Sequence, residues 1–131
     1  MSSKVRKSET EWRHQLTPEQ FRVTQERGTE KRFSGEYNNC ETPGRYVCIC
    51  CGQSLFSSDT KFDSGTGWPS FWGAISTDAV VTRPDDRFGT DLTEVLCERC
   101  DAHLGHVFTD GPKPSGQRYC INSVALKLRR R

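Results

Sequence analysis

Four of the seven cysteines form two pairs with the same internal spacing. Cys48 and Cys51 make one C-x-x-C motif, and Cys97 and Cys100 make the second. Each motif can offer two thiolates to one tetrahedral zinc ion, and four thiolates leave no open position for a reacting water. The spacing therefore predicts one structural zinc that ties distant parts of the chain together. Loss of any of the four cysteines should unfold the protein, because structural zinc binding contributes about 10–16 kcal/mol.

Two alternatives concern the same cysteines. Cys50 lies between two ligand positions, but it could replace Cys51 only in a shorter C-x-C motif, so we treat it as a bystander. Redox-active C-x-x-C pairs of the thioredoxin type would require a βαβ context. The strand-rich pattern described below does not supply that context, and zinc is therefore favoured.

Cys120 has the neighbours of a reactive thiol. Side chains alternate between the two faces of a strand, so Arg118, Cys120 and Asn122 in the segment RYCINSV would share one face. A fixed cation lowers the pKa of a nearby thiol, and the thiolate is the nucleophilic form. A free cysteine in a strand is more often an inert core residue. A cationic and an amide neighbour fit that interpretation poorly, so Cys120 is the candidate nucleophile.

Two further segments carry residues that suit a reaction site. His103 and His106 follow the second C-x-x-C motif, and since four thiolates already satisfy a metal, both histidines are free for proton transfer or substrate binding. The glycines of SGTGWPSFW predict a bent backbone that presents Trp68 as an aromatic wall. A single tryptophan is more often core than pocket. Trp68 is therefore a candidate pocket residue only in combination with the thiol and the histidines.

The elements that must position these residues are mostly strands. Thr17, Pro18 and Gln20 have the types expected at a helix start, so a short helix through about Glu26 is predicted. Beyond Gly28, short segments rich in valine, isoleucine and aromatic residues alternate with turn residues. No helical crossover separates them, which predicts antiparallel strands packed as a sandwich or a partly open barrel. The predicted strands span residues 45–49, 79–83, 94–97, 106–109 and 117–128.

Size and charge limit the function classes. A chain of 131 residues fits one domain, and we assign residues 1–15 to a polar N-terminal extension and residues 16–131 to that domain. The net charge of +2 and basic residues that cluster at the two ends argue against a nucleic-acid binder. No apolar run resembles a signal peptide or a membrane span. We therefore expect a cytoplasmic protein, although a processed organellar form would look much the same, and its cysteines should serve metal or thiol chemistry rather than disulfides.

Three segments, KFDSGTGWPSF, CDAHLGHVFTDGP and GQRYCINSVAL, closely resemble the methionine-R-sulfoxide reductases of the MsrB family. The resemblance covers about residues 16–128 and implies a β-tent of two antiparallel sheets with one zinc at the four paired cysteines. It implies that Cys120 attacks the sulfoxide sulfur of methionine-R-sulfoxide residues in oxidised proteins and becomes a sulfenic acid. Thioredoxin or another thiol reductant would then restore the enzyme, which we expect to be a monomer.

The resemblance also implies roles for the surrounding residues. Trp68 would hold the methyl group of the substrate, with Phe71 and Phe108 as further substrate-binding residues. The two histidines, His103 and His106, would orient or protonate the sulfoxide oxygen. Arg118 and Asn122 would tune and position Cys120.

One departure from the family pattern affects recycling. Many members carry a resolving cysteine before the second glycine of the GTGW segment, where this chain has Thr66. Cys40 is the remaining cysteine on a plausible mobile loop, so we propose it as the resolver. The alternative is direct reduction of Cys120 by an outside thiol, and the distance between the two cysteines decides, since a disulfide needs Cα atoms within about 7 Å. The alternative function is a zinc-stapled β domain that binds a ligand without chemistry.

Overall fold

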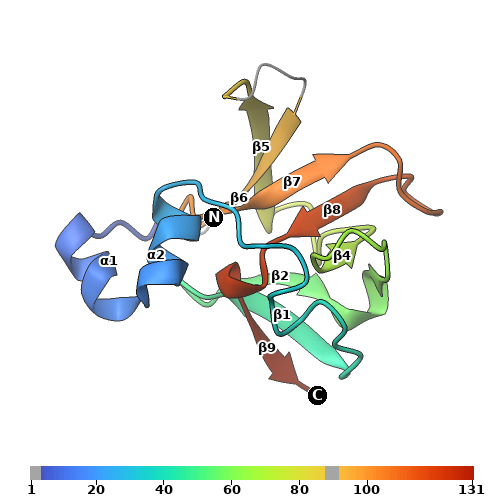
Figure 1. Cartoon of the computed structure of the whole chain (residues 1–131), viewed down its shortest axis with the longest axis horizontal. Helices are drawn as coiled ribbons and strands as arrows, with labels where there is room; N and C mark the ends of the chain where they lie inside the picture. Colours follow the sequence, from blue (N-terminus) through green and yellow to red (C-terminus); the bar gives the residue numbers. More distant parts are fainter. Residues whose placement is uncertain (1–3, 88–91) are drawn as a thin grey trace.

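The computed structural model describes residues 4–87 and 92–131. Two α-helices come first, followed by strands and two short 3-10 turns (η) (Figure 1). In chain order the elements are α1 (Glu9–Gln15), α2 (Pro18–Gln25), β1 (Gly44–Cys48), β2 (Ser54–Ser57), η1 (Ser58–Thr60), β3 (Lys61–Phe62), β4 (Ser70–Phe71), β5 (Val80–Asp85), β6 (Leu92–Cys97), β7 (His103–Phe108), β8 (Arg118–Ile121), η2 (Ser123–Ala125) and β9 (Leu126–Arg130).

The strands form two antiparallel sheets, as the sequence predicts. One sheet has three strands in the order β2-β1-β9, and the other has six in the order β3-β4-β8-β7-β6-β5. Every strand pair in both sheets is antiparallel. Within the described residues neither sheet closes on itself, so the fold is two open sheets rather than a barrel.

The core lies between the two sheets. Phe71 of the six-stranded sheet stacks on Phe56 of the three-stranded sheet, with ring centroids 4.5 Å apart. Tyr46 of β1 meets Phe71 edge to face at 5.3 Å. All three rings are fully buried. Aromatic pairs with these geometries stabilise beyond the area that they bury, and here they fix the position of β4 next to β8.

The predicted strand at residues 117–128 is wrong, because this segment belongs to both sheets. β8 ends at Ile121, η2 follows, and β9 continues in the other sheet. The turn is held by Asn122, whose backbone N–H and side-chain amide both donate to the carbonyl of Leu104 at 2.9 Å. Val124 donates to the Glu30 carboxylate at 3.0 Å. The hydrophobic residues after Asn122 therefore do not continue the face that carries Cys120.

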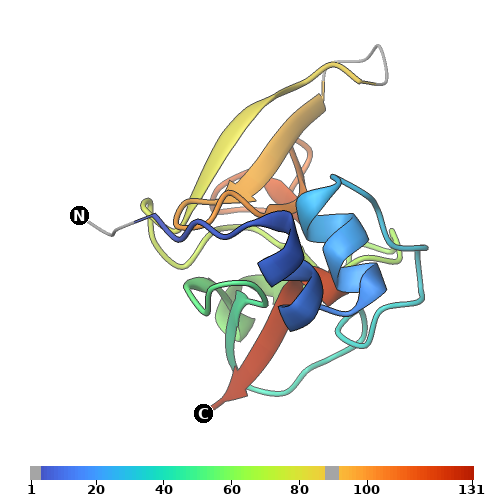
Figure 2. The same cartoon turned by 90° about the vertical axis from the view of Figure 1, so that its left-hand side faces the viewer.

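The predicted helix is α2, and its N-terminus has the expected capping box. The Thr17 hydroxyl accepts from the Gln20 N–H at 3.1 Å, and the Gln20 amide oxygen accepts from the Thr17 N–H at 2.9 Å. α1 was not predicted, although Ser8 and Glu11 form the same motif. Trp12 of α1 is only 5% exposed and belongs to the main hydrophobic cluster, and the two helices lie side by side against the sheets (Figure 2).

The remaining strand predictions are confirmed with shifted ends. β1, β5 and β6 overlap their predicted ranges, and β7 begins three residues earlier than residue 106, at His103. β2, β3 and β4 were not predicted; they have four, two and two residues. Strands this short carry too few residues for an alternating pattern to be recognised. In the described part of the chain, no helix is long and apolar enough to cross a membrane.

Candidate active site and metal centre

The two C-x-x-C motifs form matching turns at the ends of strands from different sheets. Cys48 ends β1 and Cys97 ends β6. In each turn the backbone N–H four residues on donates to the carbonyl of the first cysteine, from Gly52 at 2.8 Å and from Asp101 at 2.9 Å. Both donors have positive φ, 82° for Gly52 and 62° for Asp101. Glycine and aspartate tolerate this conformation. The chain can therefore turn sharply after each motif, and the two cysteines of each motif lie on one tight turn.

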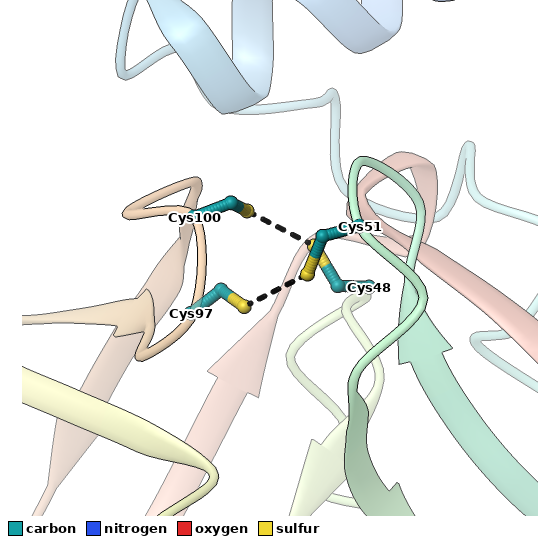
Figure 3. Close-up of side chains that lie close together, drawn as sticks. All are labelled: Cys48, Cys51, Cys97 and Cys100. Atoms are coloured by element: carbon teal, nitrogen blue, oxygen red, sulfur yellow. Dashed lines mark hydrogen bonds between the residues drawn. The ribbon is translucent and has the colours of Figure 1, made fainter. Parts of the chain in front are cut away.

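The four sulfurs are close enough to share one metal ion (Figure 3). Sγ of Cys48 lies 3.6 Å from Sγ of Cys100, and Sγ of Cys51 lies 3.6 Å from Sγ of Cys97. All four ligand atoms lie within 4.8 Å of one another. A tetrahedral zinc site with Zn–S bonds of about 2.3 Å places its sulfurs about 3.8 Å apart. The donor set and the spacing fit such an ion.

The chemistry of the sulfurs also favours a cation. Cys48 and Cys97 are 1% and 0% exposed. The hydrogen bond with Cys100 raises the pKa of the Cys48 thiol well above its usual range. Four thiols at this spacing do not all ionise without a positive charge between them, because like charges repel strongly where water is excluded. A bound metal supplies that charge and is the reason why a coordinating thiol is deprotonated.

The N-terminal segment covers this centre. The Val5 N–H donates to the carbonyl of Arg99 at 2.8 Å, and the Lys4 ammonium binds the Asp101 carboxylate at 2.8 Å. Gln15 of α1 donates its amide to the carbonyl of Cys50 at 2.7 Å. Both cysteine turns are therefore held from outside by residues that precede the first strand.

A second site lies on the six-stranded sheet and contains Cys120. It is a small, mostly apolar pocket with a volume of about 160 Å³. Cys120 of β8 is directly paired with His106 of β7, and Phe108 and Trp68 line the same pocket. Asn122, which follows β8, completes this group. The structure thus brings together five of the residues that the sequence singles out.

Two pocket residues were not predicted. Thr29 and Gly105 also line the cavity. At Gly105, a Cβ atom would lie 2.0 Å from the carbonyl oxygen of Cys120, so only glycine permits β7 to approach β8 here. The sequence could have indicated this close approach through the glycine between the two histidines, because an isolated glycine in a strand often marks a place where another backbone comes near.

The electrostatics of Cys120 differ from the expectation. Burial raises the pKa of its thiol and outweighs the lowering by Thr66, whose hydroxyl is 4.0 Å from Sγ, and by the Arg118 cation. Arg118 directs its guanidinium to Asp110, at 3.0 and 3.2 Å, and lies over the Phe108 ring at 4.4 Å. The predicted effect of the cation on the pKa of Cys120 exists, but burial of the thiol outweighs it. Thr66 is a neighbour of Cys120 that the sequence did not indicate.

His106 is oriented by a buried carboxylate. Its Nε2 lies 2.9 Å from the carboxylate of Asp85, a side chain with no exposed surface. Arg87 binds the same carboxylate at 2.7 Å. The Arg87 guanidinium, aided by the bond to His106, holds the pKa of Asp85 well below its usual range. An ionised Asp85 therefore fixes the orientation of the His106 ring.

His103 occupies a different place from the one expected. It is 1% exposed, is not among the residues that line the pocket, and packs against His106 with ring centroids 5.6 Å apart. Its Nδ1 lies 2.6 Å from Glu94, and burial lowers the pKa of its imidazole. Glu94 in turn accepts bonds from Arg27 and Arg83. The sequence feature that could have indicated this buried partner of His103 is Glu94, the single acidic residue in the mostly apolar strand β6.

Glu30 connects the pocket residues to one another. Its N–H donates to the side chain of Asn122 at 3.0 Å, and its carbonyl accepts from the Trp68 indole at 3.0 Å. Its carboxyl group, 2% exposed, accepts from Val124, and burial raises the pKa of this group. Trp68 and Asn122 are therefore held by one residue that lies about ninety positions before Asn122 in the chain.

Besides His103 and Arg118, two further predicted residues lie outside the pocket. Phe71 is in the core between the sheets, because β4 turns its ring toward Phe56. Cys40 lines another cavity, of about 310 Å³, together with Lys61. Lys61 belongs to β3, which is separated from β8 by β4, about 10 Å across two strand spacings. Burial opposes ionisation of Cys40, but hydrogen bonding with Thr42 and the Lys61 charge lower the pKa of its thiol.

Comparisons with known proteins give one family. Residues 16–130 match the model described as the SelR domain. A Hahella chejuensis protein named peptide methionine sulfoxide reductase MsrB is 55% identical over 125 residues, which cover 95% of this chain and 90% of the relative. Proteins of the same name from Methanosarcina mazei and Pseudomonas putida are similar. The first is 56% identical over 124 residues, with 95% and 89% covered, and the second is 55% identical over 128 residues, with 98% of both covered.

Proposed function

The chain belongs to the SelR-domain family of the MsrB proteins and reduces methionine-R-sulfoxide to methionine, and we propose that it does so by attack of the Cys120 thiolate in the small pocket. It is an oxidoreductase, a peptide-methionine (R)-S-oxide reductase. The observation that supports the mechanism is the convergence of Cys120, Trp68 and His106 on one cavity. A ligand-binding module without chemistry would need the aromatic wall but not the thiol.

The proposed reaction transfers one oxygen atom between two sulfurs. The Cys120 thiolate attacks the sulfoxide sulfur while a proton reaches the sulfoxide oxygen. The protonated oxygen then moves from the methionine sulfur to Cys120: the S–O bond of the substrate and the transient bond between the two sulfurs break, and a bond between Sγ and oxygen forms. Cys120 is thereby oxidised to a sulfenic acid, and the reduced methionine leaves. His106 is the proton donor, because it lines the pocket beside Cys120 and is oriented by Asp85. His103 acts indirectly, by packing against the ring of His106.

The substrate is held by an apolar wall. Trp68 and Phe108 line the pocket and suit the polarisable S-methyl group of the substrate. Asn122 is fixed by Glu30 and Leu104, and it holds the chain immediately after Cys120 in place. Arg118 supports this wall through its contact with Phe108 and moderates the pKa of Cys120.

We propose zinc as the metal and a purely structural role for it. Cys48, Cys51, Cys97 and Cys100 would hold it, and the tetrathiolate donor set suits zinc. When bound, the ion neutralises the thiolates and supplies stability. We further propose that residues 16–131 form a single domain and that the protein is a monomer. Its substrates would be oxidised proteins, and its reductant would be thioredoxin or another thiol. A reducing cytoplasm suits a chain with seven cysteines, none of which is in a disulfide among the described residues.

The stereochemistry of the substrate tests the function. Zinc-loaded protein should consume a peptide containing the R epimer of methionine sulfoxide, with dithiothreitol as the reductant, and should leave the S epimer unchanged. Only one epimer can present its oxygen to His106 while its methyl group lies on Trp68. Chromatography of the two epimers measures the result. Equal consumption of both epimers, or of neither, would contradict the proposal.

We also propose that Cys40 resolves the sulfenic acid after movement of the loop at residues 38–41. A lowered pKa suits an attacking thiol. The separation of the two cavities is the obstacle that this movement must overcome. Attack of the Cys40 thiolate on the sulfenic sulfur forms a Cys40–Cys120 disulfide and releases water, and a dithiol reductant then opens the disulfide.

The Cys40→Ser variant tests this step. With thioredoxin as reductant, its turnover should fall roughly tenfold or more, because the disulfide that thioredoxin attacks can no longer form. The first turnover, followed as methionine formed per enzyme, should stay unchanged. Peptide mapping of wild-type protein oxidised by substrate should reveal the Cys40–Cys120 bond. An unchanged thioredoxin-supported rate, with no such bond, would assign recycling to an outside thiol.

A further inference from the structure

Phe33 is an aromatic side chain whose position has no explanation in the core. It is 64% exposed, the largest exposed fraction among the big hydrophobic residues of the described chain. Its backbone has φ of +65°. This left-handed conformation costs energy for a bulky residue, and such strain is retained mostly at ligand clamps and active sites. An exposed ring on a strained backbone therefore suggests an external partner.

Contacts place Phe33 on the loop that forms the pocket wall. Its N–H donates to the carbonyl of Gly67 at 2.7 Å. Gly67 has φ of +95°, and a Cβ atom there would lie 2.7 Å from Arg32 Cβ and 2.9 Å from the Phe33 ring. Gly67 thus lets residues 32 and 33 lie directly over it. The residue after Gly67 is Trp68, and the residue before it is Thr66, which contacts Cys120.

The backbone of the same segment is anchored on both sides of this contact. Trp68 donates its indole N–H to the Glu30 carbonyl, and Ser34 donates its N–H to the Lys31 carbonyl at 3.1 Å. The backbone at Phe33 is therefore held beside the pocket wall, and only the ring must be ordered when a partner binds. A preorganised anchor loses little conformational entropy when a partner docks.

The size of the pocket determines what must lie on the rim. At about 160 Å³ it is well below the roughly 300–1,000 Å³ of sites that enclose a whole drug-sized ligand. It accepts one side chain and leaves the backbone and the flanking residues of a polypeptide outside. Those residues must cross the surface next to Trp68, where Phe33 stands.

We propose that Phe33 is a docking residue for the substrate polypeptide and packs against an apolar side chain adjacent to the oxidised methionine. The proposal rests on the proposed function and adds a sequence preference to it. Aromatic residues are the commonest anchors of protein interfaces. The enzyme should therefore favour oxidised methionines with leucine or another large apolar neighbour over those flanked by glycine.

Steady-state kinetics of Phe33→Ala test the proposal with three substrates that contain the R epimer. These are a pentapeptide with leucine on both sides, the same peptide with glycine, and N-acetylmethionine sulfoxide. The variant should lose roughly tenfold in kcat/KM for the leucine peptide, mainly through KM, in line with loss of one interface anchor. It should keep the wild-type rate on the N-acetyl substrate, and Phe33→Leu should restore most of the loss.

The controls separate docking from structure and from function. Ile75 is 40% exposed and lines cavities other than the one with Cys120, so Ile75→Ala should leave all three rates unchanged. An equal loss on all three substrates in Phe33→Ala would show a structural role and overturn the docking proposal, as would an unchanged leucine-peptide rate. Wild-type inactivity on all three substrates would instead overturn the proposed function itself.

Discussion

Replacing Cys120 by serine should lower the rate of methionine-R-sulfoxide reduction by at least about a thousandfold. The pocket supplies a proton donor and an apolar wall, but the oxygen atom needs a sulfur that can accept it. A serine hydroxyl is a far weaker nucleophile than a thiolate and cannot be oxidised to a sulfenic acid. Loss of a nucleophile that acts together with its neighbours typically removes nearly all of the catalytic effect.

The measurement is methionine formed from the R epimer in the presence of dithiothreitol. The serine variant should keep the melting temperature of the wild type, because serine is close in size to cysteine and the Thr66 hydroxyl is an available hydrogen-bond partner. Cys40→Ser is the matched control. It removes a thiol outside the pocket, and it should keep the wild-type rate because dithiothreitol can reduce the sulfenic acid directly. Residual activity above about one tenth in the Cys120 variant would assign the nucleophile elsewhere.

Removal of the metal should unfold the protein. The apparent binding energy of structural zinc, about 10–16 kcal/mol, matches or exceeds the roughly 5–15 kcal/mol by which domains are stable. The two cysteine turns follow strands of different sheets, so a shared metal ion would link the two sheets. Without the ion, four crowded thiols remain at this position and the link is lost. A strong chelator or Cys97→Ser should therefore abolish the cooperative thermal transition.

Metal content and circular dichroism report the outcome of this experiment. Cys50→Ser is the matched control, because Cys50 is a buried thiol between Cys48 and Cys51 but lies outside the set of four. It should keep one zinc ion per chain and a cooperative transition. A metal-free protein that still melts cooperatively near the wild-type temperature would show that the core between the sheets is sufficient alone. Zinc loss in Cys50→Ser would place that thiol among the ligands.

The parts of the fold that could be predicted depend on residues close together in the chain. The capping box at Thr17 and the two C-x-x-C turns are complete within a few positions, and both are found in the structure. The position of Cys120 beside His106 follows from the pairing of two strands. That pairing joins distant residues, and only the resemblance to a family implied that Cys120 and His106 share one site.

The parts that could not be predicted depend on distant residues. The strand that carries Cys120 ends at Ile121 because Asn122 and Val124 bind Glu30 and Leu104, and alternation of apolar residues contains no trace of these bonds. The carboxylate that orients His106 comes from a hairpin twenty-one residues earlier. Burial reversed the expected shift of the Cys120 pKa, because the depth of a pocket is a property of the whole fold.

The order of strands in the smaller sheet has a consequence for how the nascent chain folds. β1 lies in the middle of that sheet, between β2, which follows it closely, and β9, which is the last strand. Its pairing with β9 joins Gly44 to Arg130, so β1 keeps one unpaired edge until residues 126–130 have been synthesised. Contacts between such distant residues form slowly, and an open strand edge invites pairing with other chains. The smaller sheet therefore forms only after β9 has been synthesised, and until then the exposed edge of β1 is the site at which a chaperone would protect it.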